Sequence, residues 1–279
     1  MEIILAKSAG FCFGVKRAVN MAFQAANASD SICSIGPLIH SPQMVEKLEA
    51  EGVKVVNFVT NLTDKTAIIR SHGITRGEEA QLSQQQLEIV DATCPFVKKA
   101  QHYVSLLGEE GYSVVIVGEQ EHPEVQGIVS YAAGATTWVV ANIDQARLIP
   151  TQRKIGLVAQ TTQSFENFSD IAAVLLNKCK ELRVFNTICD ATAVRQEEAR
   201  SIASKVDLML VIGGRNSANT TRLASICTEI QPKTYHIETA EGIDSRWIDQ
   251  ITAIGITAGA STPEWIIGEV MEKLREIAK

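Results

Sequence analysis

The repeat that decides the fold begins with Cys12-Phe13-Gly14-Val15-Lys16-Arg17-Ala18. The same elements return at the same offsets in Cys94-Pro95-Phe96-Val97-Lys98-Lys99-Ala100. A third copy follows Cys189, where Val194 and Arg195 supply the same elements, shifted along the chain. Such self-similarity at a long period indicates that one supersecondary unit occurs three times.

A polar residue lies 28 positions after each of these cysteines, namely His40, His122 and Ser217. Each of them follows an apolar run that ends in glycine, and a helix is expected to begin just after it. Another strand in each repeat is expected to end in a second polar cluster: Arg70-Ser71-His72-Gly73, Ala159-Gln160-Thr161-Thr162 and Ala258-Gly259-Ala260-Ser261. Because parallel α/β sheets bind ligands at the C-terminal ends of their strands, three repeats around a common centre would each contribute one thiol and two polar loops.

Short apolar runs alternate with amphipathic stretches along the whole chain, which predicts an α/β fold with parallel sheets. Strands are predicted at 2–6, 32–36, 66–70, 112–118, 154–159, 182–188, 207–213 and 251–258. Helices are predicted at 15–27, 42–51, 96–108, 164–180, 193–204 and 262–277. The predicted domains are 1–93, which the C-terminal helix 264–279 completes, then 94–188 and 189–263.

The composition excludes several classes of protein. A chain of 279 residues that is 46% hydrophobic is too long for one core, so two or three small domains are expected. The net charge of -6 argues against broad nucleic-acid binding, which usually needs a basic face. Neither a membrane span nor a signal peptide is expected, because no apolar run approaches about 20 residues and the first residues resemble a strand. We expect a reducing cytoplasm, and therefore no disulfide framework for the six cysteines.

Three thiols brought to one point would form a soft metal site, for zinc, copper(I) or an iron–sulfur cluster. The spacings of 82 and 95 residues exclude local zinc signatures and the clustered ferredoxin run, but they do not choose the metal. Alternatively, all six cysteines are small core residues. That interpretation is assigned to Cys33, in an apolar strand, and to Cys179 and Cys227, on helical faces, because these three fall outside the repeat.

The polar loops predict an anion site, because imidazoles, hydroxyls and helix N-termini donate hydrogen bonds to phosphate oxygens. A lone histidine is usually structural, and His102 and His236, which lie outside the repeat, are taken as incidental. The remaining candidates for this site are His40, His72, His122, Ser217, Asn219 and Ser261.

Two further candidates have a competing structural interpretation. Thr161 and Thr162 would merely cap a helix that begins near Ser164, and Glu124 would be an ordinary acid of a first helical turn. The position of Glu124 two residues after His122 makes it a candidate proton donor as well. The basic residues after the cysteines are interpreted as solvated helix faces: Lys16, Arg17, Lys98 and Lys99.

With these residues assembled, the sequence resembles the 4-hydroxy-3-methylbut-2-enyl diphosphate reductases, which catalyse the last step of the non-mevalonate isoprenoid pathway. The resemblance covers essentially the whole chain. It rests on Gly10-Phe11-Cys12-Phe13-Gly14-Val15, Asp91-Ala92-Thr93-Cys94-Pro95, Glu121-His122-Pro123-Glu124-Val125, Gln160-Thr161-Thr162, and Thr187-Ile188-Cys189-Asp190-Ala191-Thr192 running on to Arg195-Gln196.

The resemblance implies three pseudo-threefold-related α/β units in a trefoil-like arrangement around one [4Fe-4S] cluster per chain. Cys12, Cys94 and Cys189 would be its three protein ligands, and one iron would stay open as a Lewis acid. The implied catalytic residues are Glu124, Thr161 and His122. The implied substrate-binding residues are His40, His72, His122, Thr161, Ser217, Ala218, Asn219 and Ser261. Ala218 is a departure, since many members have Ser-Ser-Asn where this chain has Ser217-Ala218-Asn219, so one side-chain contact to the diphosphate is lost.

The implied reaction removes the allylic hydroxyl of 4-hydroxy-3-methylbut-2-enyl diphosphate with two electrons and two protons, giving isopentenyl and dimethylallyl diphosphates. An electron donor such as ferredoxin or flavodoxin is the expected partner, with no nucleic acid and no membrane. Two other classes remain open from the residues themselves. A non-catalytic iron–sulfur electron carrier would not need the polar pocket, and a three-cysteine zinc hydrolase would be colourless and unaffected by reductants.

Overall fold

The computed structural model describes residues 1–277, which form two compact units. Unit 1 consists of Met1–Lys16, Ile39–Glu46 and the chain from Asp190 onward. Unit 2 consists of Arg17–Leu38 and Lys47–Cys189. Each unit is described below by itself.

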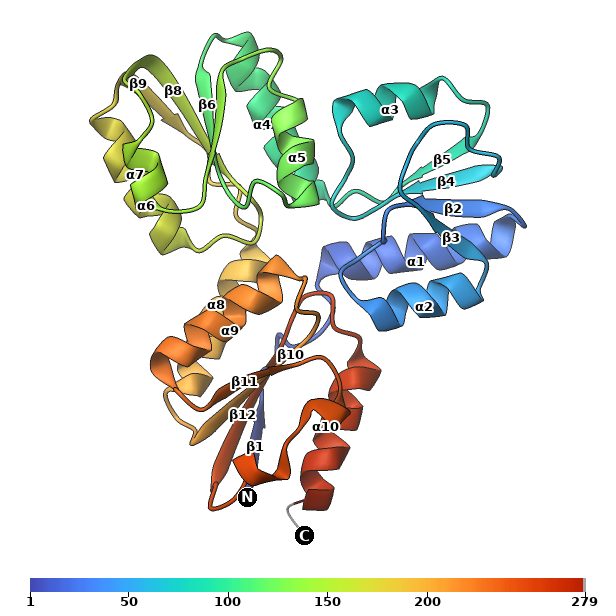
Figure 1. The fold of residues 1–279 in the computed structure, drawn as a ribbon, viewed down its shortest axis with the longest axis vertical. Helices are drawn as coiled ribbons and strands as arrows, with labels where there is room; N and C mark the ends of the chain where they lie inside the picture. Colours follow the sequence, from blue (N-terminus) through green and yellow to red (C-terminus); the bar gives the residue numbers. More distant parts are fainter. Residues whose placement is uncertain (278–279) are drawn as a thin grey trace. The chain divides into compact units, whose positions relative to one another are not determined.

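The described strands form three four-stranded parallel sheets, which are drawn with their helices in Figure 1. The β2–β5 sheet contains β2 (Ile32–Ile35), β3 (Val53–Val56), β4 (Thr66–Ile69) and β5 (Glu88–Asp91) in the order β3-β2-β4-β5. The β6–β9 sheet contains β6 (Ser113–Val117), β7 (Thr137–Val140), β8 (Gln152–Ala159) and β9 (Cys179–Val184) in the order β7-β6-β8-β9. The third sheet contains β1 (Glu2–Leu5), β10 (Leu208–Ile212), β11 (Thr234–Ile237) and β12 (Ala253–Ala258) in the order β1-β12-β10-β11. The α/β fold predicted from the sequence is confirmed.

All three sheets share one topology if β1 is counted as the last strand of its sheet. Numbered along the chain, the strands then lie in the order second, first, third, fourth in every sheet. β1 pairs with β12 from Glu2 opposite Ala253 to Leu5 opposite Ile256. The three repeats that the cysteines mark in the sequence therefore correspond to three sheets of identical strand order.

The first strand and the last helix lie in a different part of the fold from the domain predicted for them. We expected residues 2–6 to lie in the first domain, with the C-terminal helix completing it. Instead β1 joins β10, β11 and β12, and α10 (Glu264–Ile277) packs on that same sheet. The apolar face of α10 explains this placement, because Ile266, Val270 and Leu274 share one core cluster with strands β10 and β12. The other domain boundaries stay predictions.

In unit 2, alternate side chains of the β6–β9 sheet face different helices, as the two-residue period of a strand requires. Val114 and Ile116 pack in one cluster with α4 (Pro95–Glu109) and α5 (Pro123–Ser130). Val115 and Val117 pack in another with α6 (Ile143–Arg147) and α7 (Phe165–Leu176). Both faces are thus covered, which is why these strands read as continuous apolar runs.

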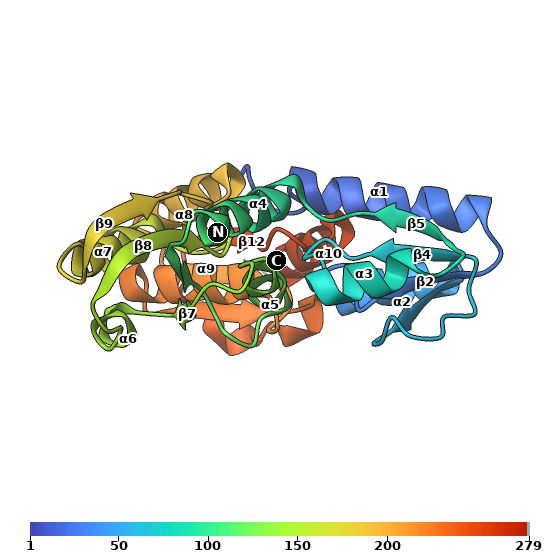
Figure 2. The ribbon, with the colours of Figure 1, turned by 90° about the horizontal axis from the view of Figure 1, so that it is seen from above.

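The β2–β5 sheet, also in unit 2, lies between α1 (Phe13–Ala28) on one face and α3 (Arg76–Ser83) on the other, as Figure 2 shows. Leu82 of α3 packs with Cys33, Ile35, Ala67 and Ile69 in one buried cluster. A further helix, α2 (Pro42–Ala50), joins β2 to β3.

In unit 1, the third sheet is also covered on both faces. Met209 and Val211 pack with α8 (Asp190–Ala203) and α9 (Ala218–Ile230), whereas Leu208, Leu210 and Ile212 pack with α10. Two short 3-10 turns, Ala240–Gly242 and Ser245–Trp247, connect β11 to β12. Each sheet therefore has its own core, and loops follow the C-terminal ends of its strands.

The observed elements differ from the predicted ones in several places, and the short helices α3 and α6 were not predicted. The helix predicted over 164–180 ends at Leu176, and Cys179 lies in strand β9, where it pairs with Gln152, rather than on a helix. Four strands were not predicted: β3, β5, β7 and β11. Each has only four residues and lies at a sheet edge, so its partly exposed side chains do not stand out as an apolar run. Among the described helices, none is long and apolar enough to cross a membrane.

Candidate functional site

The three repeat cysteines occupy equivalent places in the fold. Each lies in the connection that leaves the last strand of one sheet, directly before a helix: Cys12 before α1, Cys94 before α4 and Cys189 before α8. All three are partly exposed. The repeat found in the sequence therefore places three thiols at one kind of strand-to-helix connection.

The backbone of each cysteine makes the same hydrogen bond. The amide of Cys12 donates to the carbonyl of Ala260 at 3.1 Å, Cys94 to Ser71 at 2.9 Å, and Cys189 to Thr161 at 3.0 Å. Each acceptor is the second residue after the third strand of its sheet, since β12 ends at Ala258, β4 at Ile69 and β8 at Ala159. Every cysteine is thereby attached to the second polar loop of its repeat.

The helix N-termini give these thiols a favourable setting for metal binding. The first backbone N–H groups of a helix have no intrahelical partner and carry a partial positive charge, which stabilises a thiolate. At Cys12 such a contact is formed, because the amide of Val15 donates to Sγ at 3.5 Å. A thiolate, rather than a thiol, is the form that ligates a soft metal.

The other three cysteines lie in different settings. Cys33 and Cys227 are fully buried, and burial raises the pKa of their thiols to about 11 and about 12. These two stay protonated at neutral pH, as expected of small core residues. Cys179 is partly exposed in β9, where its Sγ donates to the carbonyl of Leu175 at 3.3 Å and burial raises its thiol pKa.

The first polar loop of each repeat begins with a glycine that extends the sheet by one hydrogen bond. Gly36, Gly118 and Gly213 donate to the neighbouring edge strand at 2.7, 2.9 and 2.9 Å. Gly213 has a φ of 142°, and a Cβ there would lie 2.5 Å from the Oγ1 of Thr262, so only glycine fits.

A helix follows each of these loops, as the sequence predicts. α2 begins two residues after His40, α5 directly after His122 and α9 directly after Ser217. His122 and Ser217 are the N-cap residues of their helices.

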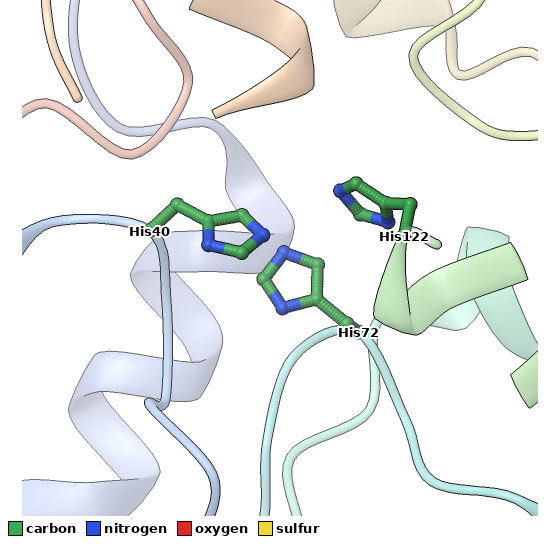
Figure 3. A group of neighbouring side chains, drawn as sticks. All are labelled: His40, His72 and His122. Atoms are coloured by element: carbon green, nitrogen blue, oxygen red, sulfur yellow. The ribbon is translucent and has the colours of Figure 1, made fainter. Parts of the chain in front are cut away.

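The imidazole of His122 is oriented by the helix that it caps. Its Nδ1 accepts a hydrogen bond from the amide of Glu124 at 3.1 Å, so the neutral ring carries its proton on Nε2. His72, from the second polar loop of the preceding sheet, lies against His122 with ring centroids 5.6 Å apart and planes at 79° (Figure 3). Two predicted substrate-binding residues from different repeats are thus side by side within unit 2.

Glu124 and Thr161 are joined by two hydrogen bonds. The amide of Thr161 donates to Oε1 of Glu124 at 2.7 Å, and its hydroxyl donates to Oε2 at 2.9 Å. The carboxyl group is 2% exposed, and burial raises its pKa to about 7 although both bonds from Thr161 lower it. The group is therefore divided between its acid and its anion near neutral pH.

The structure contradicts the interpretation of Thr161 as a helix cap. Ser164 is the N-cap of α7, and its side chain accepts from the amide of Asn167 at 3.3 Å. Thr161 instead joins two predicted site residues, since its carbonyl accepts from the amide of Cys189 while its hydroxyl donates to Glu124. Glu124 does lie in the first turn of α5, but its carboxylate binds Thr161 rather than that turn.

Unit 1 holds the remaining predicted residues. The hydroxyl of Ser261 donates to the carbonyl of His40 at 3.2 Å, which brings the two polar loops of this part together. Asn219 is 5% exposed, and its Nδ2 has no hydrogen-bond partner within residues 1–277. Ala218 is the first residue of α9, so its amide is one of the N-terminal donors. Buried unsatisfied donors of this kind fit a site that receives an anion.

The sequence interpretation missed the role of Gln160 and gave no role to His236. Gln160 is fully buried, and its Oε1 accepts from the amide of Glu119 at 3.1 Å, which fixes the loop before His122. Its presence in the Gln160-Thr161-Thr162 motif was the available signal. His236, taken as incidental, lies with Nε2 2.8 Å from the carbonyl of Gly213, a structural contact.

The solvated-face interpretation is wrong for one of the four basic residues. Arg17 is half-buried and donates to the carbonyls of Thr93 and Asp91. Lys16, Lys98 and Lys99 are exposed, as predicted, and Lys98 forms an ion pair with Asp91.

Residues 3–275 match the family described as LytB protein. The chain is 60% identical over 279 residues to the 4-hydroxy-3-methylbut-2-enyl diphosphate reductase of Syntrophotalea carbinolica, with 100% of both chains covered. It is 58% identical over 279 residues to the reductase of the same name from Geotalea uraniireducens, covering 100% of this chain and 99% of the relative.

Two solved structures are similar over most or all of their length. One is described as (E)-4-hydroxy-3-methyl-but-2-enyl diphosphate reductase, the terminal enzyme of the non-mevalonate pathway, with 43% identity, a TM-score of 0.71 and coverage of 99% of this chain and 100% of that one. The other is the E-1-hydroxy-2-methyl-but-2-enyl-4-diphosphate reductase from Plasmodium falciparum, with 27% identity, a TM-score of 0.92 and coverage of 100% and 88%. The family match over nearly the whole chain and the full-length relatives lead to one conclusion: the chain belongs to the LytB protein family.

Proposed function

We propose that this chain is a 4-hydroxy-3-methylbut-2-enyl diphosphate reductase, which removes the allylic hydroxyl with two electrons and two protons to give isopentenyl and dimethylallyl diphosphates. The full-length relatives named for this activity support the proposal. The observation that carries it within the chain is the hydrogen-bonded series from Cys189 through Thr161 to Glu124, because it links a soft ligand to a neutral-pH proton donor.

Cys12, Cys94 and Cys189 would hold one [4Fe-4S] cluster per chain, with one iron left without a protein ligand. The donor set fits this group, because three partly exposed thiols stand at helix N-termini, while two of the others are buried and stay protonated. When bound, the cluster would supply electrons and a Lewis-acidic iron. An electron donor such as ferredoxin or flavodoxin in the cytoplasm belongs to this proposal.

The diphosphate would be bound by the two polar loops of each repeat. His72 and His122 would supply imidazole N–H groups, whereas Thr161, whose hydroxyl donates to Glu124, would lie near the substrate hydroxyl. His40, Ser217, Asn219 and Ser261 would supply donors from unit 1, together with the backbone amide of Ala218. Hydrogen bonds to a charged oxygen are stronger than neutral ones, so such a set binds a diphosphate without needing a basic surface.

Proton delivery would run from Glu124 through Thr161. The protonated carboxyl of Glu124 gives its proton to the hydroxyl oxygen of Thr161, which passes its own hydroxyl proton to the departing oxygen of the substrate. The oxygen then leaves as water, a better leaving group than hydroxide. A pKa of about 7 keeps the acid form of Glu124 available at neutral pH and allows it to be reprotonated between turnovers.

Anaerobic purification, iron and sulfide analysis, and a product assay with a strong one-electron reductant test the proposal together. We expect visible absorbance, bound iron and sulfide, and formation of both diphosphate products. A bound cluster without consumption of the substrate would instead indicate an electron carrier. A colourless zinc protein whose activity does not depend on reductant would overturn the proposal in favour of a hydrolase.

A further inference from the structure

The connections that lead into the three repeat cysteines are each held by a side chain from the helix that opens the same repeat. For Cys94 that side chain is Arg17, on α1. Its Nη1 donates to the carbonyl of Thr93 at 3.2 Å and its Nη2 to the carbonyl of Asp91 at 3.4 Å. The carboxylate of Asp91 also accepts from the amide of Thr93 at 2.9 Å and pairs with Lys98, so the turn before the cysteine is fixed from two sides.

For Cys12 the holding residue is Glu198, on α8. Its Oε1 accepts from the amide of Lys7 at 2.7 Å. Its Oε2 accepts from the amide of Ser8 at 2.9 Å and from the hydroxyl of Ser8 at 2.5 Å. One carboxylate thus binds three donors of the connection between β1 and Cys12.

Arg195, one turn earlier on α8, holds the same connection closer to the thiol. Its side chain is 4% exposed, and Nη2 donates to the carbonyl of Gly10 at 2.6 Å. Gly10 has a φ of +96°, a left-handed conformation that a residue with a Cβ rarely adopts. The path into Cys12 is therefore fixed both by this turn and by two side chains of α8.

For Cys189 the contact is aromatic. Tyr103 of α4 stacks on Phe185, which follows β9, with ring centroids 4.0 Å apart and planes at 8°. Between Phe185 and the cysteine, the Oδ1 of Asn186 accepts from the amide of Ile188 at 3.1 Å, the same turn that Asp91 makes before Cys94.

These contacts follow a cyclic order along the chain. The helix after Cys12 holds the connection into Cys94, the helix after Cys94 holds the connection into Cys189, and the helix after Cys189 holds the connection into Cys12. The order follows from the shared topology, because each repeat opens with a helix and closes with the connection that leaves its last strand.

We infer that Arg17, Tyr103, and Arg195 with Glu198 are positioning residues, each group setting the backbone of the cysteine that ends its own repeat. The contacts described above are all with the connection before the cysteine, so these residues act through that connection. The consequence for the cluster rests on the function proposed above. Mutation of a group that contacts and orients a metal ligand typically lowers metal affinity by about 10- to 100-fold.

The first test measures iron loss from the cluster-loaded, full-length protein to a chelator. Arg17→Gln and Glu198→Gln should each release iron at least roughly tenfold faster than the parent, because oriented ligands retain a metal longer. The matched controls are Lys16→Gln and Glu197→Gln, exposed neighbours on the same two helices. Equal rates in a variant and its control would overturn the inference.

The second test reads each cysteine separately, in the full-length chain after its iron has been removed. Alkylation followed by mass spectrometry should show faster modification of Cys94 alone in Arg17→Gln, and of Cys12 alone in Glu198→Gln. General destabilisation would instead speed up the alkylation of all three cysteines, and that result would overturn the inference. Faster alkylation of the cysteine that directly precedes the substituted helix would overturn it as well. Ser8→Ala, which removes only the hydroxyl contact with Glu198, repeats the Cys12 test if Glu198→Gln does not fold. If the parent binds no cluster, the proposed cofactor fails while this alkylation pattern still decides whether the residues are positioning groups.

Discussion

The hydroxyl of Thr161 lies 2.9 Å from Oε2 of Glu124, and the amide of the same threonine lies 2.7 Å from Oε1. One residue therefore occupies both oxygens of a buried carboxyl group. The carbonyl of Thr161 accepts from the amide of Cys189, so the acid is connected to a proposed cluster ligand through a single residue. This relationship supports a direct path for a proton into the proposed site.

The first prediction is that Glu124→Gln slows turnover severely while the cluster and most of the substrate affinity remain. Glutamine keeps the shape of the side chain but cannot donate the proton that makes water the leaving group. The measurement is single-turnover loss of the substrate hydroxyl at saturating substrate and full cluster content. An unchanged rate, with neither reduction nor product release limiting, would rule out the proton-donor role.

Glu124 could instead be only a favourable charge in the first turn of α5, which would contribute about 0.3–1 kcal/mol to stability. On that interpretation the variant would be slightly less stable and would turn over normally. Glu121→Gln, which changes an exposed acid just before the same helix, is the matched control.

The second prediction concerns pH. Because the acid form of Glu124 is the donor and its pKa is about 7, the chemical step should slow as the pH rises through about 7. The hydrogen bond from the Thr161 hydroxyl lowers this pKa, since it stabilises the carboxylate, so Thr161→Val, which removes that bond and keeps the one from the backbone amide, should move the inflection to higher pH as well as reducing the rate. A pH profile of the single-turnover rate measures both effects. A Thr161→Val profile with the parent's inflection would contradict this coupling.

The same pKa has a consequence for stability. The pKa of Glu124 in the folded protein lies above the ordinary value of about 4.5, so its contribution to stability is fully favourable below about 4.5 and is lost as the pH rises through about 7. The thermal midpoint of the parent should therefore fall relative to that of Glu124→Gln between these two pH values. Parallel midpoints across this range would show that burial does not raise the pKa.

The third prediction concerns the diphosphate. His72→Ala should weaken binding of the substrate and of inorganic diphosphate together, with the visible absorbance of the cluster unchanged. A hydrogen bond to a charged group contributes about 1.5–3 kcal/mol, which corresponds to roughly 10- to 100-fold in affinity. His102→Ala is the control, because His102 lies outside the polar loops. Full affinity of His72→Ala for both ligands would remove His72 from the proposed site.

The fourth prediction uses the departure at Ala218. Ala218→Ser adds a hydroxyl at the first residue of α9, between Ser217 and Asn219, and should tighten diphosphate binding by a few-fold at most, because the backbone amide there is already available. The measurement is the dissociation constant for inorganic diphosphate. Weaker binding in this variant would indicate that the N-terminus of α9 does not face the anion.

Much of the fold and the site could be predicted from the sequence, because the repeat carries long-range information. The offsets that relate Cys12, Cys94 and Cys189 correctly place each of them directly before a helix. The period does not reveal which sheet contains the first strand, because the pairing of β1 with β12 joins residues about 250 positions apart. The packing of the C-terminal helix on that sheet is likewise a tertiary contact that the repeat does not contain.

The contacts that position the candidate site residues could not be predicted from the sequence, for a different reason. Arg17 reads as a surface residue because its neighbours Lys16 and Asn20 are exposed, and its acceptors at Asp91 and Thr93 lie more than 70 residues away. Glu198 lies in no recognisable motif. It binds the backbone amides of Lys7 and Ser8, and almost any residue type would supply such an amide. Side chains that bind distant backbone leave no pattern in one sequence.

We propose that Cys12, Cys94 and Cys189, and not the other cysteines, hold one iron–sulfur cluster. The most direct measurement is the iron content per chain of anaerobically purified Cys94→Ser, compared with that of Cys33→Ala, whose sulfur is buried in the β2–β5 sheet. The account predicts that Cys94→Ser loses its stable iron and visible absorbance, because a hydroxyl is a poor ligand for iron that prefers thiolate, while Cys33→Ala keeps both. Full iron content in Cys94→Ser would contradict it.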